Sequence, residues 1–205
     1  TFAPMNWYTE LFTLFAALFS VVNPLGAMPV FLSLTKEYTP QERASTALKT
    51  GVFFVIILIV AFFGGIYILK FFGISIEALR IAGGIIILSS GFALLSGEHE
   101  KNRTIDKKVK SEARERDDIS LTPIAIPLLA GPGSISLLIS QFQQERTITE
   151  YGISVLTIFL VAVVTFLILR YSSLLVKRLG QAGLNSISRI MGFIVMAVGV
   201  QYIIN

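Results

Sequence analysis

The sequence predicts an all-α, polytopic membrane protein with six transmembrane helices in a three-plus-three inverted repeat, the first and fourth helices being broken. The first observation is composition: of 205 residues, 54% are hydrophobic and 15% are charged, with a mean hydropathy of +0.74. Soluble domains carry about 25% charged residues, so this chain belongs in a bilayer. The second observation is a set of six uncharged runs, at 11–35, 50–69, 81–97, 119–144, 151–169 and 190–205.

Each run predicts one spanning helix, because a bilayer core of about 30 Å needs about 20 apolar residues. The third and sixth runs are short. We expect their helices to begin earlier, near Ser75 and Ser186, with Arg80 and Arg189 extending toward the lipid headgroups.

The first run is predicted to break at its midpoint, Asn23. Pro24 has no N–H, and its ring clashes with the carbonyl of Ser20, so the helix cannot continue unchanged. Asn is a good N-cap and Pro a good first helical residue, so a second half-helix is expected to begin there. A break at membrane depth is stable only where the freed backbone faces protein or a water-filled cavity. The break therefore predicts a binding site.

The fourth run repeats this pattern, with Gly131–Pro132 at its midpoint. The third and sixth runs also correspond, since Arg-Ile-Ala-Gly at 80–83 matches Arg-Ile-Met-Gly at 189–192. Two repeats, 1–97 and 121–205, are predicted on either side of a charged linker, 98–120. Three spans per repeat place the second repeat upside down relative to the first, the plan of many secondary transporters.

The distribution of Lys and Arg residues predicts how the chain is oriented in the membrane. Fourteen Lys and Arg residues, seven of them in the linker, fall on one side of this arrangement and three on the other. The richer side is expected to be cytoplasmic, so both termini are predicted to lie outside. The net charge of +4 has the same explanation and does not indicate a nucleic-acid partner.

The two breaks predict one substrate-binding site, with these residues: Ser20, Asn23, Pro24, Gly26, Gly131, Pro132, Gly133 and Ser134. Half-helix N-termini offer unpaired N–H groups and a positive dipole end to a carboxylate. The freed carbonyls suit an ammonium group or a small cation, so the site favours a small zwitterion. The alternative is a pair of packing kinks, since Pro and Gly are common in transmembrane helices.

Ionisable residues are absent from the middle of every predicted span, which argues against a proton relay through a buried carboxylate. Coupling to Na⁺ or H⁺ stays open. Glu77 and Arg80, three residues apart, are either a substrate gate or a local interfacial ion pair. Small residues in the second and third spans predict close helix packing: Ala61, Gly65, Ala78, Ala82, Gly83 and Gly84.

Other chemistry is not expected. With no cysteine, disulfides and thiol catalysis are excluded. The single histidine, His99, has no partners at metal-ligand spacing, and no catalytic constellation lies at depth. We therefore predict neither enzyme activity nor a bound metal or cofactor. The expected partners are a small-molecule substrate and the lipid bilayer.

Three motifs give the chain a family resemblance: Asn-Pro-Leu-Gly-Ala-Met-Pro at 23–29, Arg-Ile-Ala-Gly-Gly at 80–84, and Pro-Leu-Leu-Ala-Gly-Pro-Gly at 127–133. They resemble the MarC family of prokaryotic six-span membrane proteins, also called the neutral amino acid transporter family. The resemblance implies a cytoplasmic-membrane protein, with some relatives moving glycine and alanine. The expected function is a secondary transporter working by alternating access. A structural or assembly protein and a small-solute channel are the alternatives, and substrate, direction and oligomeric state stay open.

Overall fold

The computed structural model describes residues 7–96, 120, 125, 129–144 and 147–204. Within these ranges the regular structure is seven α-helices and no strand, which confirms the all-α prediction. The helices are α1 (Trp7–Val22), α2 (Pro24–Leu34), α3 (Pro40–Phe72), α4 (Ile76–Ser96), α7 (Pro132–Gln144), α8 (Ile148–Arg170) and α9 (Ser172–Ile204).

Five segments of the described chain are long and apolar enough to cross a membrane: Trp7–Leu34, Pro40–Phe72, Ile76–Ser96, Ile148–Arg170 and Ala182–Ile204. The protein is therefore a multi-pass membrane protein. The predicted fourth span is described only in part, because α7 has 13 residues and most of the chain before it lies outside the described residues. Linker residues 98–119, including His99, also lie outside them.

Two helices begin well before their apolar runs. α3 begins at Pro40 because Thr39 and Glu42 form a capping box, in which the Glu42 carboxylate accepts from the Thr39 N–H at 2.7 Å. The last spanning segment, Ala182–Ile204, begins close to the expected Ser186. Helical structure begins at Ser172, and a non-helical Gly180 (φ 64°, ψ 172°) joins this first segment to the span. Glycine adopts that positive φ without a steric cost.

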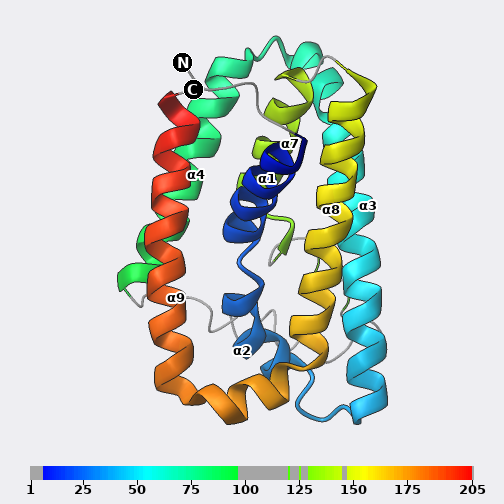
Figure 1. The fold of residues 1–205 in the computed structure, drawn as a ribbon, viewed down its shortest axis with the longest axis vertical. Helices are drawn as coiled ribbons and strands as arrows, with labels where there is room; N and C mark the ends of the chain where they lie inside the picture. The colour runs from blue at the N-terminus through cyan, green and yellow to red at the C-terminus, as the bar shows by residue number, and fades with distance from the viewer. Residues whose placement is uncertain (1–6, 97–119, 121–124, 126–128, 145–146, 205) are drawn as a thin grey trace.

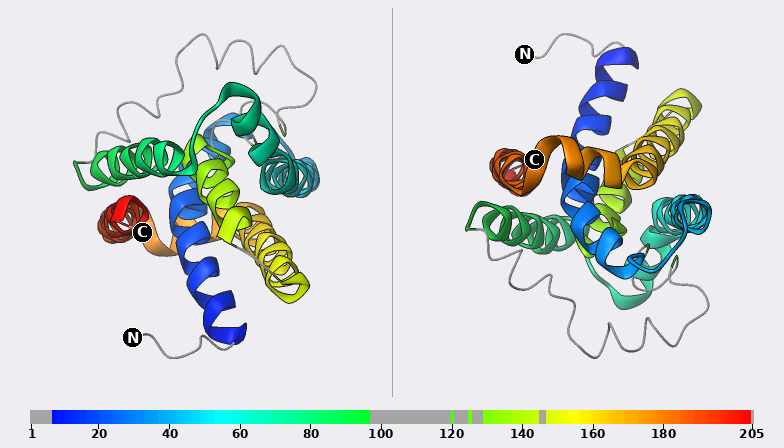
Figure 2. Two further views of the ribbon diagram at one scale, coloured as in Figure 1. Left: turned by 90° about the horizontal axis from the view of Figure 1, so that it is seen from above. Right: turned by 90° about the horizontal axis from the view of Figure 1, so that it is seen from below.

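The broken helices stand at the centre of the molecule (Figures 1 and 2). α1 and α2 follow one another down the middle, and α7 lies beside α1. On one side α4 packs against α9, and on the other α3 packs against α8. Each of these two pairs thus joins a helix that precedes residues 98–119 to one that follows them.

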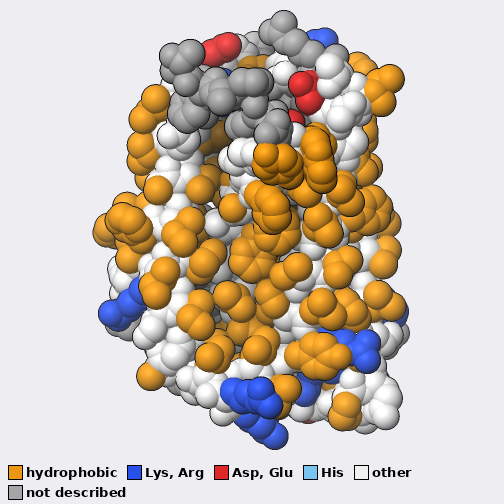
Figure 3. Space-filling view, viewed as in Figure 1, with side chains coloured by type: hydrophobic (Ala, Val, Ile, Leu, Met, Phe, Trp, Pro, Cys, Tyr) orange, Lys and Arg blue, Asp and Glu red, His pale blue; other side chains and the backbone are white. Residues whose placement is uncertain are grey.

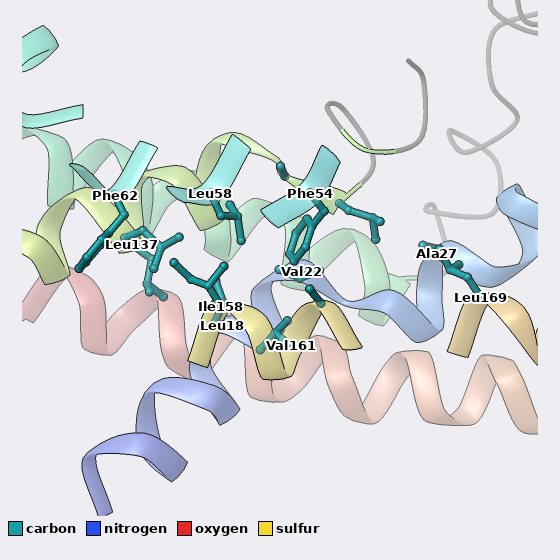
Figure 4. Close-up of a cluster of buried hydrophobic side chains, with 14 of the residues drawn as sticks. Leu18, Val22, Ala27, Phe54, Leu58, Phe62, Leu137, Ile158, Val161 and Leu169 are labelled. Atoms are coloured by element: carbon teal, nitrogen blue, oxygen red, sulfur yellow. The ribbon is translucent and has the colours of Figure 1, made fainter. Parts of the chain in front are cut away.

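The main core lies between the central helices and the α3–α8 pair (Figure 4). Leu18, Phe54, Leu58, Phe62 and Ile158 are fully buried there. Lipid tails are as apolar as these side chains, so the hydrophobic effect does not drive these helices together within the bilayer. Close van der Waals packing between the side chains holds them together instead.

Glycines bring α4 and α9 into backbone contact. A Cβ on Gly91 would lie 2.7 Å from the carbonyl oxygen of Gly192, and one on Gly192 would lie 2.8 Å from that of Gly91. A second contact lies seven residues away, where a Cβ on Gly199 would be 3.0 Å from the Gly84 carbonyl oxygen. No side chain fits between the two helices at these points.

The predicted small-residue contacts are confirmed at Gly84, and at Gly65, which packs against Ile139 of α7. The prediction for Ala78 and Ala82 is wrong, since both are exposed. They lie on the face of α4 turned away from its neighbours.

The outer surface is strongly apolar (Figure 3). Exposed large side chains occur on every long helix, among them Val60, Phe71, Phe92, Val163 and Phe193. Most Lys and Arg side chains visible in Figure 3 lie at the lower end, where α3 begins and α8 ends. An apolar surface of this extent would be a liability in water and is the lipid-facing surface of a membrane protein.

Candidate functional site

The first helix is broken at Asn23, as predicted. Asn23 has φ 47° and ψ 62°, and it alone among the described non-glycine residues has a positive φ. Asn tolerates this left-handed conformation better than most residues. Its backbone N–H donates to the Phe19 carbonyl at 2.9 Å, and its side-chain Oδ1 accepts from the Gly26 N–H at 3.2 Å. Asn23 therefore ends α1 and begins α2.

The second half-helix, α7, begins at Pro132, also as predicted. The Gly131 carbonyl accepts from the Ser134 hydroxyl at 2.9 Å and from the Ile135 N–H at 3.2 Å. The N–H groups of Gly133 and Ser134 belong to the first turn, where a helix provides no backbone partner.

Both half-helices begin at the same cavity, of about 300 Å³, here called the central cavity. From it α2 runs downward and α7 upward (Figure 1). The cavity is lined by Val21, Val22, Asn23, Ile86, Ile87, Ser90, Leu94, Leu129, Gly131, Pro132, Gly133, Ser134 and Val195. The two breaks, more than 100 residues apart in sequence, thus lie together.

Five of the eight predicted binding residues line the central cavity: Asn23, Gly131, Pro132, Gly133 and Ser134. The other three, Ser20, Pro24 and Gly26, are buried beside the break and do not line it. Gly133 keeps the cavity open, since a Cβ there would lie 2.9 Å from Ile87 Cγ1 and 3.2 Å from Val21 Cγ1.

The Asn23 side chain is the most informative polar group in this cavity. It is 3% exposed, and its Nδ2 has no hydrogen-bond partner among the described residues. A buried donor without a partner costs about 1–3 kcal/mol. Among the lining residues none is ionisable. The cavity thus offers an amide donor and a helix N-terminus in neutral surroundings.

A larger cavity of about 800 Å³, here called the upper cavity, lies near the upper ends of α1, α7 and α8. It is lined by Glu10, Phe12, Thr13, Leu14, Ala16, Ala17, Arg80, Leu137, Ser140, Gln141, Gln144, Glu150, Ile194, Val198, Gln201 and Tyr202. Arg80 lies in it and donates from Nε to the Ser140 hydroxyl at 2.7 Å. Glu77, the other predicted gate residue, is exposed and is not among the residues that line this cavity.

Sequence reasoning missed the other polar residues of the upper cavity. Glu10 and Glu150 both lie in the first turn of a helix, α1 and α8, so each alone resembles an ordinary helix-end acid. Only the packing of α1 against α8 brings them to one cavity.

A polar junction on α7 lies between the residues that line the two cavities. The Tyr202 hydroxyl donates to the Ser136 carbonyl at 2.6 Å, and the Ser136 hydroxyl donates to the Leu79 carbonyl at 3.2 Å. Gly83 packs directly against Ser136 and Tyr202. α4, α7 and α9 are therefore closely packed at this level.

Arg43 joins three helices at the lower end. Its Nη2 donates to the Thr35 carbonyl at 2.8 Å, its Nε to the Thr35 hydroxyl at 3.2 Å, and its Nη1 to the Ser173 hydroxyl at 2.7 Å. The guanidinium thus caps the C-terminus of α2, where positive charge is favourable, and ties it to α3 and α9.

Arg43→Gln is expected to destabilise the protein by about 1–3 kcal/mol, because it removes charge-assisted hydrogen bonds and the cap of α2. Thermal unfolding in detergent measures this change. Lys36→Gln is the matched control, since Lys36 is an exposed cation close to the same helix end. Equal melting temperatures for the two variants would show that Arg43 does not hold α2.

Comparison with known proteins agrees with the fold. The model of the MarC family of integral membrane proteins matches residues 8–205. A UPF0056 membrane protein of Methanocaldococcus jannaschii is 39% identical over 191 residues, which cover 93% of this chain and 92% of that protein. The UPF0056 membrane protein YvbG of Bacillus subtilis is 38% identical over 186 residues, covering 91% and 88% of the two chains.

The UPF0056 inner membrane protein MarC of Escherichia coli is 36% identical over 197 residues, covering 92% of this chain and 89% of that protein. No solved structure matches the chain significantly. The family match extends over both breaks, all five candidate spans and nearly the whole chain. This chain belongs to the MarC family of integral membrane proteins.

Proposed function

We propose that this protein is a secondary transporter of small neutral amino acids or similar zwitterions, with the central cavity as its substrate site. One observation carries the proposal: a buried amide donor without a partner, on Asn23, faces the same small cavity as the N-terminus of α7. These are groups that bind a carboxylate.

The substrate carboxylate lies between Asn23 Nδ2 and the first turn of α7. The N–H groups of Gly133 and Ser134 point out of a helix N-terminus, where the macrodipole places a partial positive charge. A hydrogen bond from the Asn23 amide to a carboxylate is worth more than one to a neutral acceptor. The substrate carboxylate thus binds without a cationic side chain.

The substrate ammonium lies at the C-terminus of α1. Val21 and Val22 line the cavity at that end, where a helix leaves its last carbonyls without backbone partners. Pro24 cannot donate to the Ser20 carbonyl, because it has no N–H. The opposed helix ends therefore complement both charges of a zwitterion.

Size and charge set the selectivity. Ligand pockets range from about 300 to 1,000 Å³, and the central cavity, at about 300 Å³, is at the small end. A substrate side chain meets Ile87, Leu129 and Val195. A charged side chain would have no counter-charge among the described lining residues, so the site favours small neutral amino acids.

Alternating access follows from an inverted repeat of six spans, which the helix pairing supports. α3 pairs with α8 and α4 with α9, and the broken helices stand between the pairs. The contacts Gly91–Gly192 and Gly84–Gly199 keep one antiparallel register about a common centre. The pairs rock about the central cavity and expose it to each side in turn. The basic lower end is cytoplasmic and both termini lie outside.

Counterflow tests the proposal. Purified protein in liposomes loaded with unlabelled alanine is expected to accumulate labelled alanine from outside, while protein-free liposomes do not. Exchange of this kind needs a carrier, since a channel only equilibrates the label and an assembly protein does not move it. Absence of counterflow for glycine, alanine and serine, with the protein folded in the vesicles, contradicts the proposal.

A further inference from the structure

We propose that the upper cavity is a second binding site for the same zwitterions, occupied before the substrate passes to the central cavity. The substrate class rests on the proposed function, but the site does not share a lining residue with the central cavity. Its walls carry both signs of charge, from helices that are far apart in sequence.

Arg80 forms the cationic wall. Its Nε bond to Ser140, at 2.7 Å, fixes the guanidinium on the cavity side of α4. A guanidinium has five N–H donors in a planar fork, so it can donate to more than one acceptor at a time, and a planar carboxylate matches its geometry. Tyr202 and Gln201 line the cavity from α9.

Glu10 and Glu150 form the anionic wall. The Glu150 carboxylate accepts from the Thr147 N–H at 2.9 Å, which fixes it in the first turn of α8. Glu10 is partly buried on α1 and faces the same cavity. A cation that enters a cavity lined by two carboxylates is attracted to both of them. A substrate ammonium is such a cation.

A zwitterion satisfies these walls better than an ion of a single charge. A metal cation would meet the repulsion of Arg80, and an anion would meet that of Glu10 and Glu150. Apolar residues of the same cavity, Leu137 and Val198 among them, can contact a small side chain.

α7 connects the two sites. Ser134 lines the central cavity, and Ser140 and Gln141 line the upper cavity. The hydrogen bond of Tyr202 to Ser136 closes the helices at the level between them. Substrate in the upper cavity is therefore held one step before this junction.

The chain has no cysteine, so a single introduced thiol reports on one cavity. Thr13→Cys places it on an exposed residue of the upper cavity. We combine it with Asn23→Asp, which removes the amide donor of the central site, and measure maleimide labelling of the purified protein. Saturating alanine is expected to slow labelling at least fivefold. Propionate and alaninamide, which each lack one of the two charges, are expected to leave the rate unchanged.

Substitutions of the charged lining residues test which of them bind the alanine that protects the introduced thiol. Glu10→Gln and Arg80→Gln are each expected to abolish the protection, and Arg80→Lys to restore part of it. Lys177→Cys, exposed at the opposite end, controls for direct effects of alanine on the reagent. Melting temperatures establish that every variant is folded.

If alanine does not slow labelling of the Thr13→Cys, Asn23→Asp protein, the upper cavity is not a binding site. The same follows if alanine slows labelling equally with and without Glu10→Gln. Counterflow by the parent protein separates the two proposals. Counterflow without protection by alanine supports the central site and contradicts the upper one. Protection without counterflow retains the upper site and contradicts the transporter.

Discussion

Asn23→Asp is expected to abolish alanine counterflow while the protein stays folded. Aspartate tolerates the left-handed backbone and keeps an oxygen for the Gly26 N–H, so the start of α2 is preserved. The change removes the Nδ2 donor and places a carboxylate where the substrate carboxylate binds. A lost hydrogen bond to a charged group is worth about 1.5–3 kcal/mol, and repulsion adds to it. Initial rates of counterflow should fall at least 100-fold.

Asn23→Gly separates binding from backbone strain. Glycine adopts a positive φ freely and is nearly as good an N-cap, so this variant loses only the side chain. Its counterflow is also expected to fall, by at least tenfold, with a melting temperature close to that of the parent. Normal transport by both variants would mean that the amide does not touch the substrate.

Gly91→Ala is expected to destabilise the packing of α4 against α9. The new Cβ would meet the Gly192 carbonyl oxygen and the Met196 backbone N at 2.7 and 2.8 Å, and backbone atoms cannot rotate away. The helices must separate, at a cost of about 1–3 kcal/mol. Thermal unfolding in detergent should show a clear fall in melting temperature.

Gly64→Ala is the matched control for this change. Gly64 lies within α3, and a Cβ there meets nothing within 4 Å. Alanine favours helix by up to about 1 kcal/mol over glycine, so this variant should be as stable as the parent or more so. If Gly91→Ala matches it, the two helices are not in backbone contact.

The sequence carries the local features of the central site. Asn23-Pro24 and Gly131-Pro132 mark the breaks because proline cannot continue a helix, whatever the tertiary structure. Three of the predicted site residues, Ser20, Pro24 and Gly26, are buried beside the break but do not line the cavity. For Pro24 and Gly26 the direction depends on how α2 turns after the left-handed Asn23, and for Ser20 it depends on which face of α1 packs against the neighbouring helices. Proximity along the chain does not give that direction.

The upper cavity could not be predicted, because it depends on contacts between distant helices. Glu10, Arg80 and Glu150 lie on α1, α4 and α8, and nothing local links them. The prediction considered Arg80 only together with Glu77, its neighbour in sequence, and did not anticipate the hydrogen bond of Arg80 to Ser140 of α7. The sequence also did not predict the helical segment that begins at Ser172. It lies in a partly polar stretch before the last span, and the non-helical Gly180 separates it from that span.

A distance from substrate to Asn23 tests the central claim most directly. The chain has five asparagines, so ¹⁵N-labelling of asparagine side chains gives few amide signals in solid-state NMR. With [1-¹³C]alanine bound, we predict that one of these signals is dephased by the carboxylate carbon and that this signal is missing in Asn23→Asp. Saturating alanine without dephasing of any asparagine amide would contradict the account.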